Sequence, residues 1–203
     1  MIRNIIFDMG HVLLWHRPME ACRALLRDEA DAQTLCKAYF GGPLWVEVDH
    51  GRLDGEAFTS AVKALLEERL HPAVDRLYHG MPKNMLFPVE GMADVTDWVL
   101  RQGYNVYLLS NAGKFMSRRR DCIPHIARFH GVMFSGDEGF VKPDPRLYHR
   151  LMERYALKPE ECFFIDDLKA NVKAARKLGI RSHHFKNNVE KLKKDLQKNG
   201  IHF

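Results

Sequence analysis

The sequence has no apolar run near the roughly 18 residues that a membrane helix needs, so no membrane association is expected. Its cysteines are few and scattered, and no pair has the Cys-x-x-Cys spacing that would favour a zinc site or a redox motif. Met1 leads directly into an apolar segment, without the arrangement of a secretory signal. These absences predict a cytoplasmic protein whose thiols are reduced.

A large charge excess is also missing. The 203 residues include 31 Lys and Arg against 26 Asp and Glu, which gives a net charge of +5. The basic residues near the C-terminus are not interleaved with aromatic side chains, so nucleic-acid binding is not expected, although a small anionic partner suits this charge. The hydrophobic fraction of 46% is typical of a globular protein, here expected to be a monomer or a homodimer.

An apolar run near the N-terminus ends at a single acid. Ile5, Ile6 and Phe7 precede Asp8, and Gly10 follows two residues later. The run is typical of a buried parallel strand, and open α/β sheets bind ligands at the carboxyl ends of their strands. A lone Asp in this place equally suits a turn, so its meaning depends on partners at other strand ends.

The chain after this strand has a helical pattern as far as about Phe87, with no predicted strand. Helices are predicted at residues 19–27, 31–40 and 56–68 and after Pro72. Asp54 is the expected N-cap of the third helix. Because this segment is too long for a single crossover connection, we expect an inserted helical subdomain at residues 15–87. Residues 1–14 and 88–203 would then form the core.

Beyond residue 88, apolar strands alternate with helices. The predicted strands are residues 104–109, 131–134, 162–165 and 180–185. The predicted helices are residues 92–101, 145–155, 168–178 and 189–198. This alternation predicts an α/β fold whose core is a Rossmann-like, doubly wound parallel sheet.

Polar side chains follow several of these strands. Ser110 and Asn111 come after one strand, and Asp166 and Asp167 end a later one. Because the carboxyl ends of parallel strands share one edge, these groups are expected to converge on Asp8. Carboxylates suit Mg²⁺, hydroxyl and amide groups suit phosphate oxygens, and an Asp carboxylate can act as a covalent nucleophile.

A basic residue, Lys142, precedes Pro143 and would offset the charge of a phosphoryl group. Each feature alone also has a structural explanation, such as a strand-end turn, a helix cap or a solvated lysine. The four features in this order point to phosphoryl transfer.

This ordered set resembles the motifs of the haloacid dehalogenase (HAD) superfamily of hydrolases, over nearly the whole chain. The matching segments are Phe7-Asp8-Met9-Gly10, Leu108-Leu109-Ser110-Asn111, Val141-Lys142-Pro143 and Phe164-Ile165-Asp166-Asp167 with Asn171. The resemblance implies a Mg²⁺-dependent phosphatase of small phosphate esters with Asp8 as the nucleophile. It implies that Mg²⁺ is held by Asp8, the Gly10 carbonyl and Asp167 with Asp166 in support, and phosphate by Ser110, the Asn111 backbone and Lys142.

One position departs from the pattern of the superfamily's phosphatases. Most of them carry a second Asp two residues after the nucleophile as general acid and base, and here that position is Gly10. The Asp-x-Gly form resembles a branch that includes bacterial α-D-glucose-1-phosphate phosphatases, which favours a sugar phosphate as substrate. His11 is a candidate for the missing acid and base, because the ordinary pKa of His suits proton transfer near neutrality.

The inserted helical subdomain at residues 15–87 resembles the helical cap of the superfamily, which implies that it selects the leaving group. The candidates for contacting it are Tyr39, Trp45, residues 49–52, and His16 and Arg17 at the cap entrance. Arg52 is preferred among them, because the aromatic residues also suit packing. Two other functions stay open: a metal-independent 2-haloacid dehalogenase and a non-catalytic protein that binds phosphorylated ligands or a partner. The pair Asp166–Asp167 favours metal over dehalogenation, whereas Gly10 supports the non-catalytic alternative.

Overall fold

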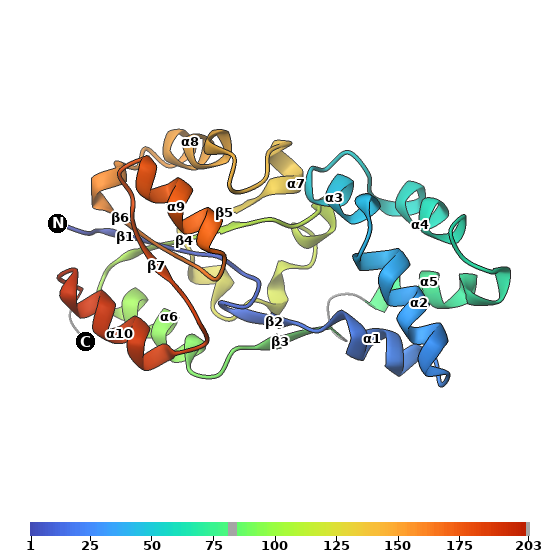
Figure 1. The fold of residues 1–203 in the computed structure, drawn as a ribbon. Coiled ribbons are helices and arrows are strands. Elements are labelled where there is room, and N and C mark those ends of the chain that lie inside the picture. Colours follow the sequence, from blue (N-terminus) through green and yellow to red (C-terminus); the bar gives the residue numbers. More distant parts are fainter. Residues whose placement is uncertain (81–84, 202–203) are drawn as a thin grey trace.

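A parallel sheet of five strands lies at the centre of the computed structural model, which describes residues 1–80 and 85–201 (Figure 1). Its strands are β1 (Asn4–Phe7), β4 (Asn105–Ser110), β5 (Gly131–Phe134), β6 (Cys162–Asp166) and β7 (Arg181–His184). They lie in the order β5-β4-β1-β6-β7, and each neighbouring pair is parallel. The predicted doubly wound α/β fold is confirmed, and the carboxyl ends share one edge.

Helices cover both faces of this sheet (Figure 1). One face carries α6 (Met92–Arg101) and α10 (Val189–Lys198), and the other carries α8 (Pro145–Arg154) and α9 (Lys169–Lys177). Along β1, Ile5 and Phe7 belong to the apolar cluster under α6 and α10, whereas Ile6 belongs to the cluster under α8 and α9. A strand buried on both faces is apolar throughout, which is why the sequence pattern identified it.

A group of five helices stands beyond the carboxyl edge of the sheet, and we call it the cap (Figure 1). These helices are α1 (Pro18–Leu25), α2 (Glu29–Phe40), α3 (Pro43–Asp49), α4 (Gly55–Lys63) and α5 (His71–Gly80). Two antiparallel strands, β2 (Leu14–His16) and β3 (Leu86–Pro88), join the cap to the core. Both of the predicted cap boundaries fall inside this small sheet.

The expectation of no strand in the cap segment is wrong at its two ends. Each of β2 and β3 has only three residues, and each pairs with a segment far away in the chain. Strands this short show no alternation of apolar and polar residues, so the sequence pattern could not reveal them.

Two helices of the cap also differ from the prediction. The third predicted helix ends at Lys63, and its N-cap residue Asp54 makes no side-chain cap; instead Asp54 pairs with Arg118 at 3.0 Å. Helix α3 was not predicted, because it begins at Pro43 directly after two glycines, a pattern that is typical of the end of a helix. Pro43 is in fact the first residue of α3, where a missing N–H costs no hydrogen bond.

The rest of the described chain is short helical segments and loops. These segments are η1 (Glu68–Leu70), η2 (Lys114–Met116), η3 (Arg120–Cys122), η4 (Ile126–Arg128), α7 (Ser135–Glu138) and η5 (Pro159–Glu161). Among the described residues, no helix combines the length and the apolar character that a bilayer crossing demands. Helix α7 directly follows β5 and lies against α3 of the cap, so it is part of the contact between cap and core.

Candidate active site

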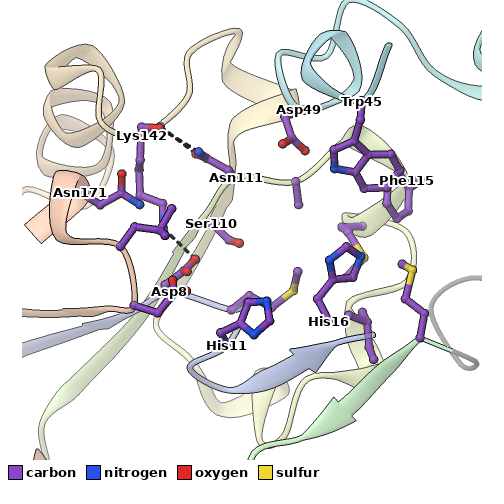
Figure 2. A pocket seen from close by; sticks show the side chains of 18 residues that line it. Asp8, His11, His16, Trp45, Asp49, Ser110, Asn111, Phe115, Lys142 and Asn171 are labelled. Carbon is purple, nitrogen blue, oxygen red and sulfur yellow. Dashed lines mark hydrogen bonds and ion pairs between the residues drawn. The ribbon is translucent and has the colours of Figure 1, made fainter. Parts of the chain in front are cut away.

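A cavity of about 320 Å³ lies between the carboxyl edge of the sheet and the cap (Figure 2). The core contributes Asp8, Ser110 and Lys142 to its lining, and the cap contributes Trp45 and Asp49. These core residues come from the residue directly after β1, from the end of β4 and from the loop before α8, so the fold brings together groups that are far apart in the sequence.

Lys142 is the centre of a buried charged network. Its Nζ lies 2.7 Å from Asp8 Oδ1, 2.8 Å from Asp166 Oδ2 and 2.7 Å from the carbonyl oxygen of Leu109. These three acceptors match the three donors of an ammonium group. Burial lowers the pKa of Lys142, but Asp8 and Asp166 outweigh it and the net shift is upward. Lys142 is therefore a fixed cation beside the expected nucleophile.

Asp8 is buried close to other acids. Burial raises the pKa of Asp8 to about 7; Lys142 opposes this shift, and Asp166 and Asp167 add to it. The carboxylate therefore costs free energy to ionise in this site, and a further cation would favour its charged form.

Asn111 holds the backbone of Lys142. Its Oδ1 accepts a hydrogen bond from the Lys142 backbone N–H at 2.7 Å, and its Nδ2 donates to the Lys142 carbonyl at 2.9 Å. This pair of bonds ties the loop before α8 to the end of β4. The side chain of Asn111 therefore positions the lysine, a role that the sequence pattern did not indicate.

Asp166 is completely buried and fully hydrogen-bonded. Its Oδ1 accepts from the backbone N–H of Leu168 at 2.8 Å and from Nδ2 of Asn171 at 3.0 Å. With Lys142 on the other oxygen, Asp166 orients its neighbours more than it faces the cavity.

A divalent cation fits the acids at this edge. Asp8, Asp166 and Asp167 each offer a carboxylate oxygen, and these oxygens lie within 4.8 Å of one another. Asp167 is half-buried, and burial and then Asp166 raise its pKa. An all-oxygen set with room for water is the environment that Mg²⁺ prefers, and the ion would relieve the repulsion among the acids.

The loop after β1 places Gly10 and His11 at the cavity. No atom lies within 4 Å of the position that a Cβ on Gly10 would take. His11 is exposed, has a φ of 53°, and meets Trp15 edge-on with 5.6 Å between ring centroids. Both residues line the cavity, so His11 stays a candidate for proton transfer.

A comparison with protein families matches residues 2–179 to the haloacid dehalogenase-like hydrolases. The chain belongs to this family. The HAD-like match covers β1 to α9 and therefore every motif described above.

This HAD-like chain is similar in sequence to two curated relatives and in fold to one solved structure. It is 24% identical to D-ribitol-5-phosphate phosphatase of Bacteroides thetaiotaomicron, over 94% of this chain and 95% of the relative. It is 28% identical to mouse acyl-CoA dehydrogenase family member 10, over 89% of this chain but only 17% of the relative's length. A HAD family enzyme of B. thetaiotaomicron, solved with magnesium and inorganic phosphate, has a similar fold (TM-score 0.71, 22% identity, 93% of this chain and 96% of that chain).

In this HAD-like hydrolase, the cap and the small sheet that joins it to the core each bring one titratable residue to the cavity. Asp49 ends α3, and His16 lies on β2 with its ring stacked on Trp45 at 6.3 Å between centroids. The sequence prediction preferred Arg52, but Arg52 does not reach the cavity residues and pairs with Glu47 at 2.5 Å. Asp49 could not be favoured over Arg52, because α3 was not predicted and its orientation was unknown.

His16 is expected to make the protein less stable in mild acid. Burial, with a smaller contribution from His11, lowers the pKa of His16 from 6.5 to about 4. The unfolded chain therefore binds the proton more tightly, and the stability present above pH 6.5 is lost as the pH falls toward 4. We expect His16→Gln to be more stable than the wild type by about 2 kcal/mol at pH 4.5 and similar to it at pH 7.5. Urea unfolding of both proteins across this range, in EDTA, measures the difference; parallel curves would contradict it.

Proposed function

We propose that this chain is a Mg²⁺-dependent phosphatase that hydrolyses a small phosphate monoester through an aspartyl-phosphate on Asp8. The observation that carries the proposal is the position of Lys142, whose ammonium group bonds both Asp8 and Asp166 at the edge of the cavity. A fixed cation beside a carboxylate nucleophile is what phosphoryl transfer requires, since charge accumulates on the phosphoryl oxygens.

The residues of the cavity have complementary roles in this proposal. Asp8 attacks phosphorus, Ser110 and the Asn111 backbone bind phosphoryl oxygens, and Lys142 offsets their charge. Asp8, the Gly10 carbonyl and Asp167 hold Mg²⁺. When bound, the ion polarises the phosphoryl group and keeps the neighbouring carboxylates ionised. Closure of the cap over the core excludes bulk water and selects the leaving group.

The substrate class is a small phosphorylated metabolite, with sugar and polyol phosphates favoured. One relative that matches this chain over nearly its full length is named a D-ribitol-5-phosphate phosphatase. A cavity of about 320 Å³ has the size of a small-molecule site. Dehalogenation is the weaker alternative, because it has no use for the cluster of three acids that could bind a metal ion.

Phosphate release with and without metal tests this function. We expect release from at least one of ribitol 5-phosphate, glucose 1-phosphate and glucose 6-phosphate in Mg²⁺, its loss in EDTA, and its return when Mg²⁺ is restored. The dehalogenase alternative predicts chloride release from 2-chloropropionate in EDTA. A folded protein that binds Mg²⁺ and phosphate but releases phosphate from no substrate would instead support the non-catalytic alternative.

A further inference from the structure

Asp49 faces the cavity from the side opposite the core acids. It is the last residue of α3, and Figure 2 places its carboxyl group between Trp45 and Asn111, pointing into the cavity. It shares the cavity lining with Asp8 and Lys142. A substrate phosphate beside Asp8 would therefore direct its ester oxygen toward the cap and Asp49.

One oxygen of the Asp49 carboxyl group has no hydrogen-bond partner in the part of the chain that the structure describes. This oxygen, Oδ1, is buried. An unpartnered buried carboxylate is costly, whereas a protonated carboxyl can donate to a substrate oxygen. Burial raises the pKa of Asp49 to about 7, and Lys142 opposes the shift. The group can therefore both give and take a proton near neutral pH.

The position of Asp49 is fixed by the core. Its backbone carbonyl accepts a hydrogen bond from Ser135 Oγ at 2.6 Å. Two residues later Gly51, with a φ of +70°, lies so close to Gly136 that an added Cβ would be 1.9 Å from the Gly136 carbonyl oxygen. Both core partners belong to α7, which directly follows β5. Asp49 is thus held against the same sheet edge that carries the nucleophile.

The core, by contrast, has no acid where one is expected. Gly10 leaves open space beside Asp8. We propose that Asp49 is the general acid and base of this enzyme, supplied by the cap in place of the side chain that Gly10 lacks. This inference rests on the proposed phosphatase function and assigns its proton transfers.

The reaction balances with this assignment. In the first step Asp8 attacks phosphorus, the bond from phosphorus to the ester oxygen breaks, and Asp49 gives its proton to the departing alkoxide. In the second step water attacks the aspartyl-phosphate, Asp49 takes a proton from that water, and the bond between Asp8 and phosphorus breaks. One ester and one water become one alcohol and one phosphate, and Asp49 is protonated again.

The other titratable groups around the cavity are less suited to this role. The proposed nucleophile Asp8, the metal ligand Asp167 and the cation Lys142 already have other roles. Burial makes His16 a weak base with a pKa of about 4. His11 is the remaining competitor, but it is exposed and lies beside Trp15 on the loop after β1. The two candidates can be separated by substitution.

The test compares Asp49→Asn with wild type on two substrates in Mg²⁺. On a sugar phosphate, whose alkoxide needs a proton, we expect turnover to fall by about 10²- to 10⁴-fold. On 4-nitrophenyl phosphate, whose leaving group needs none, we expect a burst of nitrophenol stoichiometric with the enzyme and then slow turnover, because only the second step still needs a base. Asp75→Asn, a cap acid paired with Lys63 outside this cavity, is the matched control and should turn over both substrates like wild type.

The outcomes distinguish this inference from its alternatives. Full turnover of the sugar phosphate by Asp49→Asn would overturn it, and so would loss of both the turnover and the burst in a variant that unfolds like wild type. If His11→Ala shows the burst and Asp49→Asn does not, His11 is the acid and base, and the assignment to Asp49 is overturned. Failure of the wild type on every substrate would instead refute the phosphatase function itself.

Discussion

Asp8→Asn is expected to abolish phosphate release and, without divalent metal, to raise the stability of the folded protein at pH 8. Loss of the nucleophile should lower turnover by roughly 10⁴-fold or more, as for other covalent catalysts. The gain in stability comes from removing a charge that is buried near Asp166 and Asp167. The amide oxygen of Asn can still accept the hydrogen bond that Lys142 donates to Asp8 Oδ1.

The pH dependence of this gain follows from the direction of the pKa shift. The pKa of Asp8 rises from 3.8 to about 7 on folding, so the folded state binds the proton more tightly than the unfolded chain. The contribution is fully present below pH 3.8 and is lost as the pH rises through 7. Asn has no such dependence. In EDTA the two proteins should therefore differ by on the order of 3 kcal/mol at pH 8, and little at pH 4.

Guanidinium unfolding at pH 4, 6 and 8, in EDTA and in Mg²⁺, measures the difference in stability, and phosphate release in Mg²⁺ measures the loss of turnover. Mg²⁺ should stabilise the wild type, since it binds only the folded state, and should stabilise Asp8→Asn less. Normal phosphate release by Asp8→Asn would show that Asp8 is not the nucleophile. A variant less stable than the wild type at pH 8 in EDTA would contradict the account of a costly buried charge.

Much of the fold followed from the sequence because the core strands are buried on both faces. β1 and β4 are apolar after a first Asn, and β6 is apolar from its start; a polar residue ends or directly follows each strand, and the parallel order brings these residues to one edge. The same order brings Asp8 and Asp166 together, and Asn111 holds Lys142 within hydrogen-bonding distance of both.

The cap was harder to predict, because its placement depends on long-range contacts. The approach of Gly51 to Gly136 and the bond from Ser135 to Asp49 join segments with no shared pattern in the sequence. The strands β2 and β3 are similarly defined only by pairing with each other. The role of a residue such as Asp49 can therefore be recognised only in the folded structure, whereas Asp8 can be recognised in the sequence because it follows an apolar run.

The missing acid of the core can be restored to test what the cap supplies. Gly10 is free of the left-handed backbone that resists a side chain, and a Cβ there meets no atom within 4 Å. Gly10→Asp should therefore fold and present a carboxyl group beside the leaving oxygen. In the Asp49→Asn background, we expect it to recover turnover of a sugar phosphate by about 10²-fold or more, because the proton donor returns.

The same substitution should change the otherwise wild-type enzyme little, because Asp49 already provides the proton and two acids in one small cavity repel each other. Steady-state phosphate release from the single and double variants, with 4-nitrophenyl phosphate as the substrate that needs no acid, completes the comparison. A large gain from Gly10→Asp alone would mean that the natural enzyme lacks an effective acid. The protein would then depend on substrates with good leaving groups, and Asp49 would have no part in proton transfer.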